Sequence, residues 1–109
     1  MPPTPADDPA RAELRRLLAD HDEVELRPMF GTLAALVDGH VFAVALGGLI
    51  GVKLGPADLA ELTAVPGSEP VMMGTRQMRP YRSLPPTLTD DERSAWLARS
   101  RSHVAGEYA

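Results

Sequence analysis

The sequence predicts an α+β fold, a two-layer sandwich in which an antiparallel β-meander sheet packs against N-terminal, middle and C-terminal helices. Three observations predict this class. Apolar residues near both ends of the chain recur every three or four positions, as they do on one face of a helix. From residue 24 to residue 28 the apolar repeat shortens to two, and nearly continuous apolar stretches then follow to about residue 54. Turn residues then divide this stretch into short pieces that are typical of consecutive strands.

The first helix is predicted over residues 9–21. Asp7 or Asp8 can cap it, and Pro9 suits its first position because the missing N–H has no partner there in any case. The apolar residues that follow share one face: Ala10, Leu14, Leu17 and Leu18. We expect residues 1–8 to be a disordered N-terminal tail and residues 9–109 to form a single domain.

Four strands are predicted next, over residues 24–28, 32–37, 40–46 and 49–54. Asp38 and Gly39 separate the second and third strands, and both residue types tolerate the positive φ of a type I′ hairpin turn. Gly47-Gly48 is the next turn signal. Gly51 lies inside the fourth strand, where glycine indicates a bulge or a close backbone approach.

The remainder of the chain predicts a short helix, two extended segments and a final helix. The short helix begins at Gly55-Pro56 and ends at Pro66-Gly67. Segments 70–73 and 78–84 are expected to be extended, and their prolines to confine them to sheet edges or loops. Thr89 and Glu92 have the spacing of a capping box, which predicts a helix that runs to about residue 103 or 105.

Composition excludes several classes of protein. The 109 residues include no cysteine, so disulfides, iron–sulfur clusters and thiol nucleophiles are ruled out. The formal net charge of −4 does not favour binding to nucleic acid or to an anionic membrane. The longest uncharged run, residues 41–52, is too short for a bilayer, which takes about twenty residues. No signal peptide is recognisable, so we expect a cytoplasmic protein.

No catalytic or metal-binding motif stands out. His21, His40 and His103 belong to three different elements without the spacing of a metal site, and no G-x-S-x-G motif is present. The carboxylate clusters flank helix ends, where capping and the helix dipole account for them. We therefore expect no metal, no cofactor and no enzymatic activity.

One segment departs from the acidic average. Arg76, Arg79 and Arg82 fall within seven residues that contain no acid, and Tyr81 lies between the last two. Arginines interleaved with an aromatic can bind phosphate and stack on a base or on a partner. Arg76, Arg79, Tyr81 and Arg82 are therefore the candidate partner-binding residues. The alternative is a solvated arginine edge of the sheet, or ion pairs with the acids between residues 20 and 25.

An ordered series of short motifs resembles a known family. The series consists of Arg27-Pro28-Met29-Phe30-Gly31, Asp38-Gly39, Val41-Phe42-Ala43, Val52-Lys53-Leu54, Met73-Gly74, Met78, Tyr81 and Leu84-Pro85. In order and spacing it is similar to the TfoX N-terminal domain family, named after the bacterial competence regulator TfoX (Sxy), and to its stand-alone, single-domain members. The resemblance implies a two-layer sandwich with an antiparallel sheet. It carries over no catalytic residues. The apolar character of the matching residues predicts that Met29, Phe30 and Phe42 supply core and that Met78, Tyr81 and Leu84 seat the last strands on it.

The resemblance has departures as well as matches. Arg76 matches a basic position that is usual in the family. Thr32 stands where a second glycine is usual, Pro80 stands where glycine is common, and Val71-Met72 replace an aromatic residue. The departures leave open the exact shape of the segment that carries the arginines.

The expected function is a non-enzymatic regulatory or protein-interaction module. Full-length members of the family carry a second, helical domain and act with the cyclic-AMP receptor protein on competence genes. The resemblance therefore implies a protein partner such as a transcription regulator, and a transcriptional coregulator role. The alternative is a small-molecule-binding or enzymatic domain with a pocket between sheet and helices. Direct nucleic-acid binding is disfavoured because no helix is basic, and a homodimer remains open because a meander leaves edge strands.

Overall fold

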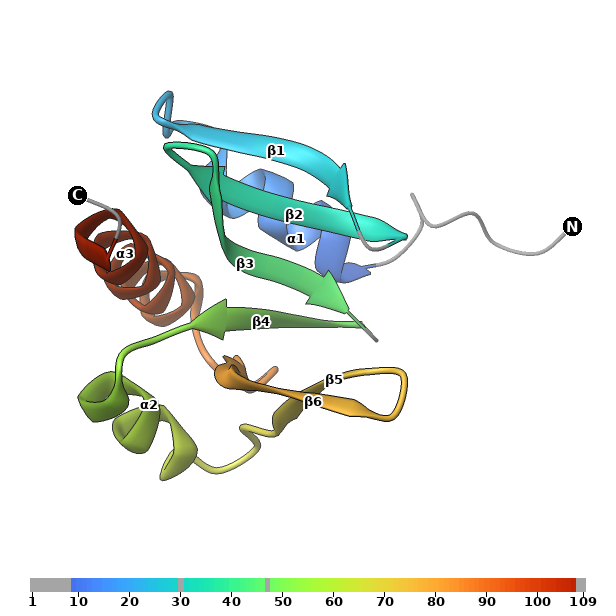
Figure 1. Ribbon diagram of the computed structural model, residues 1–109, viewed down its shortest axis with the longest axis vertical. Coiled ribbons are helices and arrows are strands. Elements are labelled where there is room, and N and C mark those ends of the chain that lie inside the picture. Colours follow the sequence, from blue (N-terminus) through green and yellow to red (C-terminus); the bar gives the residue numbers. More distant parts are fainter. Residues whose placement is uncertain (1–8, 30, 47, 108–109) are drawn as a thin grey trace, which may run out of the picture.

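The computed structural model describes residues 9–29, 31–46 and 48–107 and contains one antiparallel sheet and three helices (Figure 1). The six strands follow the order β1-β2-β3-β4-β6-β5. The predicted α+β class is confirmed. The predicted tail at residues 1–8 lies outside the described residues. In chain order the elements are α1 (Pro9–Leu18), β1 (Val24–Met29), β2 (Thr32–Val37), β3 (His40–Leu46), β4 (Leu49–Lys53), α2 (Pro56–Thr63), β5 (Pro70–Met73), β6 (Arg76–Ser83) and α3 (Asp90–Glu107).

The predicted turns that define the meander are present. Asp38 has φ 52° and Gly39 has φ 80°, the two positive values that a type I′ turn requires. Gly48 also has a positive φ of 80°, whereas Gly47 lies outside the described residues. These turns join β2 to β3 and β3 to β4 as antiparallel neighbours.

All three helices end at other residues than predicted. α2 ends at Thr63, before the predicted stop at Pro66-Gly67, and Ala64 is its C-cap. α1 ends at Leu18 rather than at residue 21, because the chain turns there: the amide of His21 donates to the carbonyl of Leu18 at 3.1 Å. The amide of Val24 then donates to the carbonyl of His21 at 3.1 Å and leads directly into β1. α3 continues to Glu107, about one turn further than predicted, because Val104 is buried against the core.

The expectation that prolines confine both late strands to an edge holds for β5 and is wrong for β6, which lies between β4 and β5. Pro80 is tolerated inside the sheet because the pairing is interrupted around it. The register passes from Pro70↔Arg82 to Met72↔Gln77, so residues 78–81 of β6 lie opposite one residue of β5. On the other side Pro80 lies just beyond the β4 ladder, where its carbonyl accepts the amide of Leu54 at 3.0 Å.

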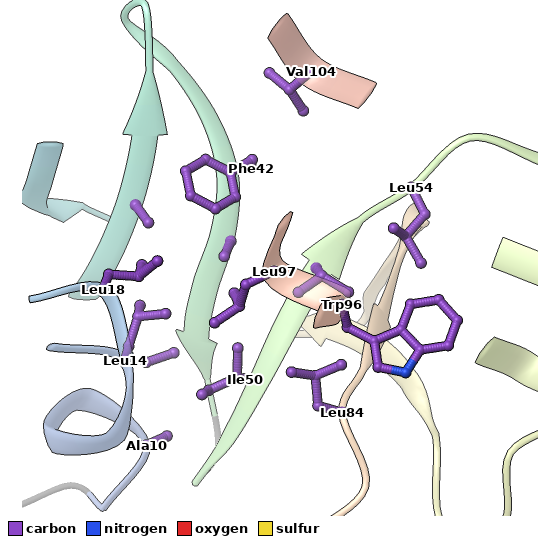
Figure 2. Packing of buried hydrophobic residues seen from close by; sticks show 14 of the residues in the cluster. Ala10, Leu14, Leu18, Phe42, Ile50, Leu54, Leu84, Trp96, Leu97 and Val104 are labelled. Atoms are coloured by element: carbon purple, nitrogen blue, oxygen red, sulfur yellow. The ribbon is translucent and has the colours of Figure 1, made fainter. Parts of the chain in front are cut away.

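The main core lies between the sheet and the two long helices. Figure 1 shows α1 behind β2 and β3, and α3 packs against β3 and β4 on the same face of the sheet. Phe42 is fully buried at the centre, as expected, and Figure 2 shows its ring among side chains from both helices. Phe30 lies outside the described residues. The labelled members of this cluster are Ala10, Leu14, Leu18, Phe42, Ile50, Leu54, Leu84, Trp96, Leu97 and Val104.

A second, smaller apolar cluster covers the opposite face of the sheet. Its buried members are Ala34, Leu36, Val44, Val71 and Tyr81, with Met29 and Met78 packed at its border. Side chains that alternate along β2 divide between the two clusters, as a strand with two buried faces requires. The hairpin formed by β5 and β6 supplies Val71 and Tyr81, so it acts as the cover of this face.

Candidate functional site

The hairpin of β5 and β6 carries the residues that the sequence singled out. Its strands are joined through Gly74, whose φ of 64° lies in the left-handed region that glycine adopts without a Cβ penalty. Met73 and Arg76 are the last paired residues before this turn. Arg76 therefore lies at the free end of the hairpin.

Arg82 is committed to a structural contact. Its Nε donates to the Ser68 hydroxyl at 3.1 Å and its Nη2 donates to the Ser68 carbonyl at 3.0 Å. The Ser68 hydroxyl in turn donates to the carbonyl of Ser83 at 2.8 Å, and the Ser83 hydroxyl accepts the amide of Glu69 at 2.8 Å. Arg82 thus ties the loop after α2 to β6.

Tyr81 is buried, with 9% of its surface exposed, and packs in the second apolar cluster. Its ring covers the sheet next to Leu36 and Val44 rather than presenting a face to solvent. The structure therefore does not place Tyr81 and Arg82 on an open surface with the other two arginines.

Arg76 and Arg79 are exposed, and neither makes a hydrogen bond or an ion pair with a described residue. The alternative of ion pairs with the acids of residues 20–25 is therefore wrong over the described part of the chain. Two of those acids have other partners: Glu23 lies 3.0 Å from Arg101, and Glu25 lies 2.6 Å from Arg27.

Sequence reasoning missed Met72 as a surface residue. Met72 is 47% exposed and is the exposed large hydrophobic side chain among the described residues. It pairs with the exposed Gln77 across the hairpin. Alternation could have indicated this position, because Val71 points into the second cluster and its neighbour must point away. Arg76 is the next residue to Gln77 and pairs with Met73, so alternation places it on the other face of the hairpin end. We refer to Met72, Arg76 and Gln77, which share the end of the hairpin, as the hairpin-end surface.

A separate groove lies where three elements meet, at the end of β4, the start of α2 and the end of α3. It is a shallow groove, largely open to solvent, with a volume of about 400 Å³. Its lining residues are Lys53, Leu54, Gly55, Pro56, Leu59, Arg79, Pro80, His103 and Glu107. Within it the Nζ of Lys53 lies 2.9 Å from a carboxylate oxygen of Glu107, and the Nε2 of His103 lies 3.7 Å from the other.

The charged groups at the start of α3 serve the fold. Arg16 donates to both carboxylate oxygens of Asp90, at 2.7 and 2.9 Å, and this contact lowers the pKa of Asp90. The backbone amide of Thr89 donates to Glu92 at 2.9 Å and lowers the pKa of that carboxyl. The amide of Glu92 donates to the Thr89 hydroxyl at 3.2 Å, which confirms the predicted capping box.

Over the described ranges, no three histidine, aspartate or glutamate side chains come together as ligands for a metal ion. His21 is instead in contact with Arg101, at 3.0 Å from its Nδ1. In the same part of the chain, no helix combines the length and the apolar character that crossing a membrane requires.

No curated protein and no solved structure matches the chain significantly. A family model does match. The matched segment begins in the second half of α1 and includes most of α3, so it extends beyond the motif series at both ends. This model describes the TfoX N-terminal domain and covers residues 16–104. By this match, which spans most of its length, the chain belongs to the TfoX N-terminal domain family.

Proposed function

We propose that this chain is a non-enzymatic regulatory domain that binds a protein partner through the hairpin-end surface. The observation that carries the proposal is the position of Met72 beside the paired end of the hairpin, half-exposed, with Arg76 nearby and without an ionic partner among the described residues. Methionine and arginine are enriched at protein interfaces, and methionine adapts to irregular apolar pockets. The end of the hairpin thus offers an apolar anchor, Met72, and, one pair further along, a cation, Arg76, that has no ionic partner in the described part of the chain.

The way the hairpin is anchored supports the proposal. Tyr81 and Val71 hold one side of the hairpin against the sheet, and Arg82 holds its base through Ser68. A rigid mount reduces the entropy that binding would cost. β5 is also an edge strand, so its outer backbone groups are open to a partner strand.

The charge of the surface suggests the chemistry of the partner. Arg76 is exposed and has no ionic partner among the described residues, although the formal net charge of the chain is −4. An acidic protein surface with a small apolar pocket would complement Arg76 and Met72. Membership of the TfoX N-terminal domain family suggests a transcription regulator as that partner, a coregulator role for the chain, and a cytoplasmic location.

The test is a tagged pull-down from the native host, with binding then re-measured using the purified partner. The double variant Met72→Ser, Arg76→Glu should weaken binding at least about tenfold, because it removes the anchor and reverses the charge. Arg15→Glu is the matched control, since Arg15 is an exposed arginine on α1 without an ion pair to a described residue. Arg82→Glu is left out because it would break the Ser68 contacts.

The outcomes separate the possibilities. Recovery of a transcription regulator or polymerase subunit that the double variant loses supports the coregulator role. Equal binding by the double variant and the wild type overturns the proposed surface. Recovery of the chain alone, with a dimer in light scattering, would replace the partner with a second copy. A salt-dependent shift of duplex DNA would point to direct DNA binding instead.

A further inference from the structure

We propose that the groove between β4, α2 and α3 binds a small organic monocarboxylate with an apolar body. This inference does not depend on the hairpin-end surface, because Met72 and Arg76 do not line the groove. The two proposals can therefore fail separately.

The shape and walls of the groove suit a small ligand. Its volume of about 400 Å³ lies within the range of known ligand sites, about 300–1,000 Å³. Leu54, Pro56, Leu59 and Pro80 form apolar walls. Such walls favour a ligand with a hydrocarbon or aromatic part that leaves water on binding.

Arg79 supplies the charge that would select an acid. Its guanidinium is exposed and makes no ion pair with a described residue. A planar guanidinium binds a carboxylate through two parallel hydrogen bonds, which gives both strength and orientation. Arg82 uses its guanidinium to bind Ser68, whereas Arg79 makes no such contact with a described residue and its guanidinium can bind a ligand.

The remaining charges favour one negative charge over two. Lys53 and Arg79 are opposed by the single carboxylate of Glu107, and Glu107 lies 2.9 Å from Lys53. The groove is therefore positive although the chain as a whole is negative. Glu107 would repel a dianion such as phosphate more than a monocarboxylate.

The N-terminal end of α2 adds a positive helix-end potential, part of which Asp58 in its first turn offsets. Gly55 is its N-cap and makes no side-chain cap, and Pro56 follows at the first position, so backbone N–H groups of the first turn lack a side-chain acceptor. The imidazole of His103 packs against Gly55: a Cβ atom on Gly55 would lie 3.1 Å from its Nδ1. Glycine at this position therefore lets the His103 ring form a wall of the groove.

The test is a titration of isotope-labelled protein followed by amide NMR resonances. Benzoate and hexanoate are the probes, their uncharged amides are the matched isosteres, and inorganic phosphate is the anion without an apolar body. The acids should shift the resonances of Gly55, Leu59 and His103 with a dissociation constant of about 1 mM or lower. The amides and phosphate should bind at least about tenfold more weakly.

Three variants make the result specific. Arg79→Ala should weaken benzoate binding at least about tenfold, and Arg79→Lys should restore part of it. Arg15→Ala should leave binding unchanged, because Arg15 is an exposed arginine of α1 outside the groove and makes no ion pair with a described residue. The proposal is overturned if the acids shift no groove resonance, if acid and amide bind equally, if phosphate binds as well as benzoate, or if Arg79→Ala binds like the wild type.

Discussion

Val71 of β5 packs directly onto the backbone of Gly51 in β4, although the two strands are not neighbours in the sheet. A Cβ atom on Gly51 would lie 2.8 Å from Cγ2 of Val71 and 3.5 Å from Cγ2 of Val44. The backbone of Gly51 is not in the left-handed region, so space rather than conformation requires glycine here. This contact is what allows the β5–β6 hairpin to lie over the second face of the sheet.

Gly51→Ala should destabilise the protein by about 1–3 kcal/mol, because the added methyl group overpacks this contact. The loss should be smaller in a Val71→Ala background, which makes room for the methyl group. A double-mutant cycle in urea unfolding measures the difference as a coupling energy, expected at about 0.5–3 kcal/mol. Additive single effects would contradict the proposed close approach.

Phe42→Ala should lower the free energy of unfolding by about 3–5 kcal/mol, because Phe42 is fully buried between the sheet and both long helices. Met72→Ala is the control, since Met72 is exposed, and its effect should stay within about 0.5 kcal/mol. Urea unfolding checks both. A Phe42→Ala loss under about 1 kcal/mol would show that the ring is not part of the core.

Ser100→Ala should cost about 1–3 kcal/mol. The Ser100 hydroxyl is fully buried in α3 and lies 2.7 Å from both the Phe42 carbonyl of β3 and the Lys53 carbonyl of β4. Without the hydroxyl, the carbonyls of Phe42 and Lys53 lose the buried donor that they share. Ser102→Ala, at an exposed position of the same helix, should change stability by less than about 0.5 kcal/mol in thermal or urea unfolding. Equal effects of the two variants would refute the role given to the hydroxyl.

Acid should weaken the start of α3. The backbone and hydroxyl of Thr89 lower the pKa of Glu92 from its ordinary 4.5, and Arg16 lowers the pKa of Asp90 from its ordinary 3.8. Because the folded pKa values lie below the ordinary ones, the stabilisation is present above those values and is lost as the pH falls through the folded values.

The pH dependence can be measured as the urea midpoint from neutral to strongly acidic pH. Glu92→Gln should lower the midpoint at neutral pH and converge toward the wild type in acid, since glutamine keeps an acceptor but does not titrate. Asp22→Asn is the control, because Asp22 is exposed, lies outside the helices and makes no hydrogen bond or ion pair with a described residue, and it should follow the wild-type profile. A constant offset between Glu92→Gln and the wild type at every pH would contradict the assignment.

The local parts of the fold were predictable because their signals are local. Asp38-Gly39 determines a type I′ turn through its own backbone preferences, and Thr89 with Glu92 caps α3 through contacts three residues apart. The place of β6 was not predictable from Pro80. A proline removes a hydrogen bond from the sheet only where its missing N–H would face a paired residue. That depends on the register of the neighbouring strands, which residues distant in the sequence set.

The candidate site divides in the same way. The sequence by itself predicted the turns, the apolar runs of the meander, the packing of Tyr81 on the core and the cluster of arginines near residue 79. Only the tertiary structure decided which face of the sheet Tyr81 covers, that Arg82 bonds to Ser68, that Met72 is exposed, and that Arg79 lines a groove with His103. The physical reason is that turns and caps are stabilised within a few residues. Burial and charge pairing depend instead on which distant elements the folded chain brings together.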